Sequence, residues 1–151
     1  MPITILHFGV MAPVRHYLPG KVHTGSFILA NLWMDAQAIV SYFLSLPLPD
    51  HGFVHTFLGA LLISIVLTSL YPWNRPNFSS WVIGAFLGTF THVTLDMLIH
   101  PEMDPMYPFH GNPYFQGWME PLSLFLVPLT IWFIFQIVSD TLDYVRRHPE
   151  P

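Results

Sequence analysis

Long apolar stretches constrain this sequence more than any other feature, because each has about the length that crosses a lipid bilayer. A helix of about 20 mostly apolar residues spans the hydrocarbon core. The chain holds four such stretches, at about residues 24–46, 51–71, 79–100 and 120–138. Stretches of this length favour helices, which satisfy their own backbone polar groups in lipid. The sequence therefore predicts an all-α integral membrane bundle with about four transmembrane helices.

The composition agrees with a chain that has lipid as its main surroundings. Only 9% of the 151 residues are charged and 52% are hydrophobic, whereas about a quarter of the residues in an ordinary soluble domain are charged. The length fits a single domain over residues 1–151. The net charge of −4 gives no reason to expect a nucleic-acid partner, and the lack of cysteine excludes disulfides and thiolate metal ligands. Membrane lipids are the expected partners.

The segments outside the four stretches also have a distinct character. Residues 2–14 are apolar enough to enter the bilayer as a re-entrant or interfacial piece, and they lack the basic region of a removable signal peptide. Residues 101–117 contain four prolines among several aromatic residues. This loop is too rich in proline for a helix, and we expect it to pack over one end of the bundle.

The basic residues predict an orientation. With four crossings, Arg15 and Lys21 precede the first span, Arg75 separates the second from the third, and Arg146 and Arg147 follow the fourth. All five then lie on one side, and the loops on the other side contain no Lys or Arg. Because positive loops stay in the cytoplasm, the pattern predicts two cytoplasmic termini.

The sharpest local pattern is a carboxylate between two histidines at four-residue spacing, His92, Asp96 and His100. This spacing keeps the three side chains on nearly one face of a helix. They can offer two nitrogens and an oxygen to one ion, or the carboxylate can orient an imidazole that binds the ion. An ionisable residue inside a membrane helix is by default functional. A polar patch at the helix end, with His100 at the water interface, is the alternative.

Further candidate ligands occur in other parts of the chain. His51 and His55 share a face at the start of the second stretch, on the same side as the end of the third, so the two patterns can meet. An ordinary interfacial histidine pair is the alternative. His7 can reach the bundle if the N-terminal segment enters the membrane, although a lone histidine of this kind is more often a packing residue.

Asp35 lies near the middle of the first stretch, four residues after Asn31. A carboxylate at that depth costs roughly 2.5–3.5 kcal/mol on insertion scales. A metal ion or a protonated histidine would offset this cost. A structural acid that is hydrogen-bonded to Asn31 is the alternative.

Several of these motifs occur together in one known group of membrane proteins. The matching residues here are Met1-Pro2-Ile3-Thr4, His7, Asp35, His51, His55, His92, Asp96, His100 and Met106-Tyr107-Pro108-Phe109. In this order they resemble the bacterial family of inner-membrane metal-dependent hydrolases of the LexA-regulated type, together with a sister family of small membrane proteins. The resemblance covers about residues 1–110. It implies a distant likeness to the zinc-dependent phospholipase C and P1 nuclease group, and thus a helical metal site that cleaves phosphoesters.

Two departures from the family pattern concern charged groups. The family's Leu-Pro-Asp-x-Asp motif reads Leu32-Trp33-Met34-Asp35-Ala36-Gln37 here, so the proline and the second acid are replaced. The segment that holds His51 and His55 lacks the family's arginine, and its histidines are four residues apart rather than five. The missing groups are those suited to a second metal and to phosphate charge.

Two functional hypotheses follow from these residues. The first is a hydrolase of the bacterial inner membrane that acts on phosphoesters or lipids, with a divalent metal, zinc before manganese or iron. Its ligands would come from His7, Asp35, His51, His55, His92, Asp96 and His100, and either Asp35, if it is not a ligand, or a non-ligating histidine would act as the general base. The second is a non-catalytic scaffold or accessory subunit of a larger membrane complex, with a structural metal or polar cluster. A di-iron desaturase would need adjacent histidine pairs, and this sequence has no His-His.

Overall fold

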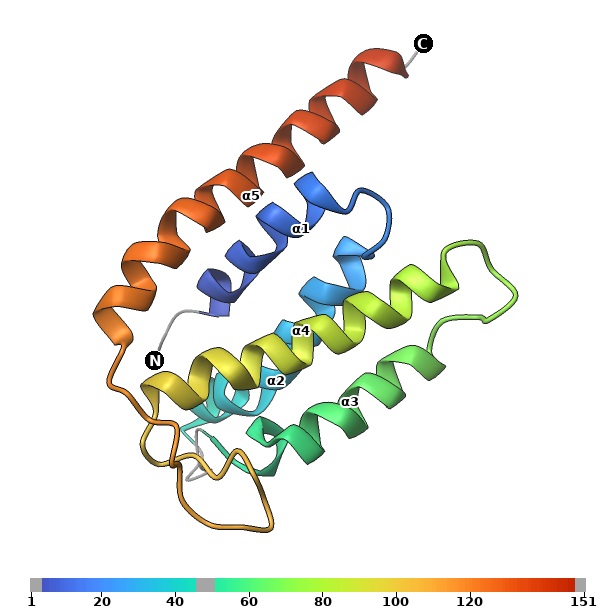
Figure 1. The fold of residues 1–151 in the computed structure, drawn as a ribbon. Helices are drawn as coiled ribbons and strands as arrows, with labels where there is room; N and C mark the ends of the chain where they lie inside the picture. Colours follow the sequence, from blue (N-terminus) through green and yellow to red (C-terminus); the bar gives the residue numbers. More distant parts are fainter. Residues whose placement is uncertain (1–3, 46–50, 149–151) are drawn as a thin grey trace.

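The computed structural model describes residues 4–45 and 51–148, and every regular element in these ranges is helical (Figure 1). The elements are η1 (Thr4–Val10), α1 (Met11–Tyr17), α2 (Thr24–Leu44), η2 (Phe53–His55), α3 (Phe57–Ser69), α4 (Phe78–Ile99) and α5 (Met119–Arg147). Both η elements are 3-10 helices. The all-α prediction is confirmed for these residues.

Two of the helices are long and apolar enough to cross a membrane by themselves, which is fewer than the four predicted. These are α4, with 22 residues, and α5, with 29. The 21 residues of α2 have sufficient length, but Asn31, Asp35 and Gln37 make its sequence more polar. The 13 residues of α3 cover only about 20 Å, whereas the hydrocarbon core is about 30 Å thick.

The shortening of α3 has a local cause. The helix expected from residue 51 begins at Phe57, because η2 ends at His55 and Thr56 has an extended backbone. The side chain of Thr56 then caps α3, since its hydroxyl oxygen accepts a hydrogen bond of 2.9 Å from Gly59 N. As a result, His51 and His55 lie in the segment that precedes α3 and not in the helix itself.

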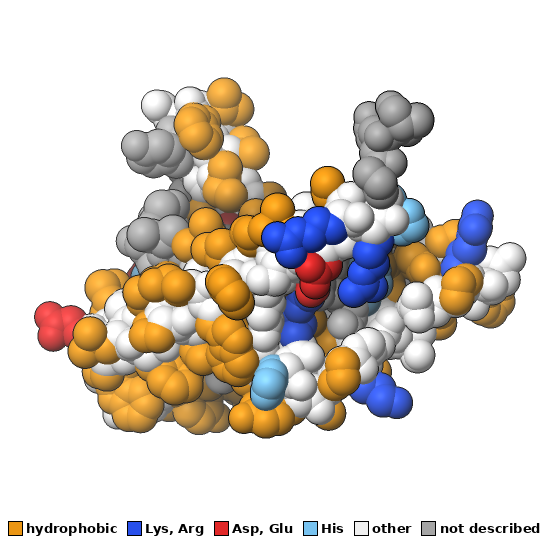
Figure 2. All heavy atoms as spheres, turned by 90° about the horizontal axis from the view of Figure 1, so that it is seen from above, with side chains coloured by type: hydrophobic (Ala, Val, Ile, Leu, Met, Phe, Trp, Pro, Cys, Tyr) orange, Lys and Arg blue, Asp and Glu red, His pale blue; other side chains and the backbone are white. Residues whose placement is uncertain are grey.

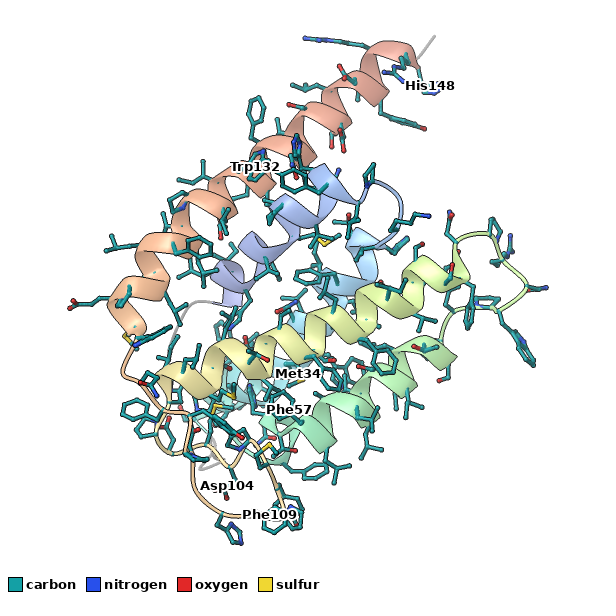
Figure 3. The ribbon with its side chains drawn as sticks, in the orientation of Figure 1. Met34, Phe57, Asp104, Phe109, Trp132 and His148 are labelled. Carbon is teal, nitrogen blue, oxygen red and sulfur yellow. The ribbon has the colours of Figure 1, made fainter. Side chains whose placement is uncertain are left out.

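The bundle is centred on α4, which packs against α2 on one side and α3 on the other. Two glycines allow α2 to approach closely. A Cβ atom on Gly84 would lie 2.5 Å from His23 O, and one on Gly88 would lie 2.7 Å from Phe27 O. Met34 of α2 is fully buried in the core between these helices (Figure 3).

The N-terminal segment lies inside the bundle, along α5 (Figure 1). Thr130 donates a hydrogen bond of 3.3 Å to Leu6 O, and Gln136 Nε2 donates one of 3.2 Å to Ala12 O. The path of η1 and α1 leads from the interior of the bundle to the loop that precedes α2. The segment is therefore a structural part of the bundle, and it carries His7 inward.

The two ends of the bundle differ in charge. Figure 2, viewed from above Figure 1, shows Lys and Arg side chains gathered on one face, where Arg15 pairs with Asp140 of α5. At the opposite end lies the loop of residues 101–117, with Asp104 and Phe109, while His148 lies at the far end of α5 (Figure 3). This separation matches the grouping that the sequence predicts.

The loop of residues 101–117 is anchored to the end of α4 as expected. Gln116 N and Trp118 N both donate to Leu98 O, at 3.2 and 3.3 Å. Asn112 Nδ2 donates to Met97 O and His100 O, at 2.6 and 2.8 Å. The loop therefore holds the end of α4, including His100, in a fixed position.

Candidate metal centre

The polar residues of α2 and α4 face each other across the contact between the two helices. On α4, the four-residue series of Gly84, Gly88, His92 and Asp96 is buried throughout. Because the glycines bring the two backbones close together, the next two turns place His92 and Asp96 against α2. The face of α2 that contacts them carries Asn31.

Four side chains from three elements converge at this point. His92 Nε2 lies 3.2 Å from Asp35 Oδ1 and 3.1 Å from Asp96 Oδ2. His55 Nε2 of η2 lies 3.4 Å from Asp35 Oδ1 and 3.9 Å from Asp96 Oδ2. We call these four residues the buried centre, and each offers one ligand atom within 4.8 Å of the other three.

These separations suit a tetrahedral ion. Zinc bonds of about 2.0–2.1 Å to nitrogen or oxygen give ligand-to-ligand distances of roughly 3.3–3.4 Å in a tetrahedron. Of the four distances between an imidazole nitrogen and a carboxylate oxygen, three, at 3.1, 3.2 and 3.4 Å, lie close to that value, and the fourth is 3.9 Å. Two imidazoles and two carboxylates are also a donor set that zinc and related divalent ions accept.

The charge of the buried centre also fits a divalent cation. Asp96 is 1% exposed and His92 is completely buried, whereas the side chain of Asp35 is 15% exposed. Two ionised carboxylates in such surroundings are costly unless positive charge compensates them. A divalent ion would balance both carboxylates and leave the imidazoles neutral, so the residues present fit this group.

Asn31 fixes the orientation of His92. Asn31 Nδ2 donates to Phe27 O at 2.9 Å, so its carbonyl oxygen faces His92 Nδ1 at 3.2 Å. An amide oxygen only accepts, and Nδ1 must therefore carry the proton. Nε2 then points toward the carboxylates without a hydrogen-bond partner of good geometry. Metal-ligating histidines are commonly held in this way, with the second ring nitrogen bonded to an oxygen.

Asn31 thus has a different partner from the one that the sequence suggests. Instead of stabilising Asp35 as a structural acid, it contacts His92. Asn31 lies one turn before Asp35 on α2, and both side chains are directed toward α4. The four-residue spacing reveals this shared face, but it does not reveal that Asn31 contacts His92 Nδ1 while Asp35 contacts His92 Nε2.

His7 approaches the buried centre from the N-terminal segment. Its Nε2 lies 3.1 Å from Asp96 Oδ1, the carboxylate oxygen that is directed away from His55. Its ring also stacks on that of His92, with the ring centroids 4.2 Å apart. His7 is 2% exposed. His7 is therefore placed to orient Asp96 and to pack against the ring of His92, and it lies outside the four residues of the buried centre.

His51 and His100 lie together at the edge of the buried centre, and Glu102 accompanies them. Glu102 Oε1 lies 3.2 Å from His51 Nδ1 and 3.0 Å from His100 Nδ1. His100 is only 8% exposed, so the protein encloses most of its side chain. Sequence analysis missed Glu102 as a partner of these histidines, although the His100-Pro-Glu102 spacing was a usable signal.

We call His51, His100 and Glu102 the outer group. Its surroundings contain both groups that raise and groups that lower the pKa of His51 and of Glu102. Burial and the nearby His100 lower the pKa of His51, although Asp96 and Glu102 favour its protonation. Partial burial acts to raise the pKa of Glu102. A hydrogen bond from its own backbone and the neighbouring imidazoles outweigh that effect and hold this pKa below its usual value. The Glu102 side chain is therefore an anion at neutral pH.

Comparison with known families supplies the cellular setting. The family described as YdjM inner membrane protein matches residues 13–148 of the chain. The chain belongs to this family. The match includes every residue of the buried centre and leaves His7 outside it. The family description supports an inner membrane protein, and it mentions neither metal binding nor hydrolase or nuclease activity. No curated protein and no solved structure is significantly similar to the chain.

Proposed function

We propose that this protein is a multi-pass inner-membrane hydrolase that depends on a divalent cation, with zinc as the ion that best suits its donors. The convergence of His55, His92, Asp35 and Asp96 at tetrahedral spacing inside the bundle carries this proposal. A bound zinc ion would lower the pKa of a water molecule and polarise a substrate oxygen. The residues of the chain would hold the ion and move the proton.

The four residues of the buried centre have unequal access to solvent, which assigns them different roles. His55, His92 and Asp96 are 1% exposed or less, and they would form a fixed set of three ligands. Asp35 is the more accessible member, and it lies 3.2 Å from His92 Nε2 and 3.4 Å from His55 Nε2. Three protein ligands with one exchangeable position are typical of catalytic zinc sites. Asp35 would leave that position to a water molecule and accept its proton as the general base.

The depth of the centre favours a substrate at the membrane surface. Asp96 lies three residues before the end of α4 at Ile99, which is about 5 Å along the helix axis. With α4 as a span, the centre would lie within about two helical turns of the lipid headgroups, since His92 is seven residues before Ile99. A phosphoester in or near a headgroup is the substrate class that this position and the resemblance to phosphoesterases support.

Replacing Asp35 tests its assignment as the base. In Asp35→Asn, we expect metal binding to persist through the other three ligands, while hydrolysis of a phosphoester substrate by the zinc-loaded protein falls by roughly 10²–10⁴-fold. The measurements are bound zinc per chain and the rate of phosphate-ester cleavage in detergent. Asp143→Asn, which changes an exposed carboxylate near the end of α5, is the control. Full activity of Asp35→Asn would refute the role of Asp35, and inactive zinc-loaded wild-type protein would refute the hydrolase.

A structural metal centre is the second candidate, and one observation favours it. If Asp35 stays bound, the protein supplies all four positions of a tetrahedral ion, as closed structural zinc sites do. The ion would then tie α2, η2 and α4 together. In that case Asp35→Asn would lower metal content and the thermal midpoint together, and the wild-type protein would show no hydrolysis.

The orientation belongs to the same proposal. We place the basic loops and the C-terminus in the cytoplasm, with α2 and α3 crossing alongside α4 and α5. The expectation of a cytoplasmic N-terminus concerns residues 1–3, which lie outside the described residues. The outward faces of α3 and α5 support lipid contact, since Ile65 and Phe135 are 51% and 68% exposed.

Cysteine labelling tests this orientation cleanly, because the sequence contains no cysteine. In intact cells, a membrane-impermeant maleimide should label Asn112→Cys. It should label His148→Cys only after permeabilisation. The reverse pattern would overturn the proposed orientation.

A further inference from the structure

A second group of potential ligands lies at the entrance of the bundle, outside the buried centre. It consists of His51, His100 and Glu102, and each of these residues offers a ligand atom within 4.8 Å of the other two. The two imidazole rings are 3.9 Å apart between centroids and are inclined by 35°. We propose that these three residues bind a second divalent transition-metal ion.

The buried polar atoms of the group point to a ligand. The side chains of His51 and His100 are 8% and 10% exposed, yet His51 Nδ1 and His100 Nε2 have no hydrogen-bond partner of good geometry. Buried polar atoms in proteins are nearly always satisfied. Two adjacent imidazoles also repel each other if both are protonated, so Glu102 alone does not account for the pair. A cation would engage both rings in their neutral form.

The surroundings hold His100 in place for this role. Its backbone N donates to Asp96 O at 2.8 Å, and its backbone O accepts from Asn112 Nδ2 at 2.8 Å. Glu102 is 55% exposed, and it leaves one side of the group open to water. The resulting site has two nitrogens, one carboxylate oxygen and open positions, which suits zinc, cobalt, nickel or iron rather than magnesium or calcium.

The two sites are neighbours with separate ligands. His51 and His55 both lie in the segment before α3, and the centroids of their rings are 5.0 Å apart. His55 belongs to the buried centre, whereas His51 is directed toward His100. The second ion therefore requires no residue that the proposed hydrolase uses, and it can be tested independently.

Cobalt titration of the metal-free, detergent-purified full chain provides the test. We expect the wild-type protein to bind two Co²⁺ per chain, and Glu102→Gln and His51→Ala to bind one each with the same buried site retained. Cobalt in the outer site should absorb weakly, as higher-coordinate cobalt does, whereas tetrahedral cobalt in the buried centre absorbs intensely. Loss of only the weakly absorbing component in both variants would support the proposal.

Asp104→Asn is the matched control, because Asp104 also pairs with a histidine, His110, at 2.9 Å in the same loop but lacks a second imidazole. It should still bind two ions. Two bound ions in Glu102→Gln would overturn the proposal, and so would a wild-type protein that binds no ion or binds a single ion that Glu102→Gln retains. If the wild-type protein binds one ion that Glu102→Gln loses and Asp96→Asn keeps, the outer site stands and the buried centre fails.

Discussion

The two long apolar helices, α4 and α5, differ in how the protein uses them. In their most apolar windows, 44% of α4 is buried inside the protein, compared with 17% of α5. α4 carries glycines and ionisable residues on the face that it buries, whereas α5 exposes large side chains such as Leu124 and Phe125. The comparison teaches that mean hydropathy identifies both helices as candidate spans, whereas the distribution of small and polar residues distinguishes the helix that carries the candidate site.

The largest effect that we predict from this difference concerns close packing. Gly84→Leu would force side-chain atoms against the α2 backbone, since a Cβ there already lies 2.5 Å from His23 O. We expect a loss of about 3 kcal/mol or more in stability, because backbone cannot yield as a side chain does. The measurements are the thermal midpoint and the yield of monodisperse protein. Val127→Leu, a smaller enlargement at an exposed position of α5, should change neither, and equal effects would remove the distinction between the helices.

A smaller effect follows from removing charge at the site. Asp96→Asn keeps the shape of the side chain and removes its negative charge, so we expect metal content to fall roughly 10-fold or more while the chain still inserts. Zinc, manganese and iron per chain would be measured for both proteins. Asp140→Asn on α5 should leave metal content unchanged. Wild-type protein without bound metal after purification free of chelators would refute the buried centre.

The smallest of the three effects concerns support of a ligand. Asn31→Ala removes the oxygen that holds His92 Nδ1, and we expect metal affinity to weaken about 10-fold with the stoichiometry unchanged. Competition with a chromophoric chelator measures this affinity. Gln136→Ala, which removes a hydrogen bond between α5 and the N-terminal segment, should cost about 1 kcal/mol of stability and leave affinity as it is. Unaltered affinity in Asn31→Ala would show that His92 needs no such support.

Periodicity and length predicted the parts of this molecule that depend on regular helices. The stretches at about 24–46 and 79–100 correspond closely to α2 and α4. The four-residue spacing placed His92 and Asp96 on one face, and the structure brings them together with Asp35 and His55. Helix geometry alone carries this information, because residues four apart always lie side by side.

The misjudged parts depend on irregular backbone or on polar helix ends. The second stretch began too early because hydropathy does not detect the 3-10 turn at Phe53–His55. The fourth stretch covers only the apolar part of α5, which continues to Arg147 through polar and charged residues that a search for apolar stretches leaves out. The contact of His51 with His100 and Glu102 depends on how the segment before α3 meets the end of α4, which spacing along the chain does not encode.

If α5 crosses the bilayer as we propose, its charge-free length would set the depth of the other helices. Between Glu120 and Asp140 the sequence has no charged residue, a length of roughly 30 Å that equals an ordinary hydrocarbon core. In the proposed orientation, the final turns of α5, with their Asp and Arg residues, would extend into water. Because helix mismatch is relieved by tilting or by local thinning of the bilayer, the depth of His92 and its neighbours below the headgroups would depend on the thickness of the membrane.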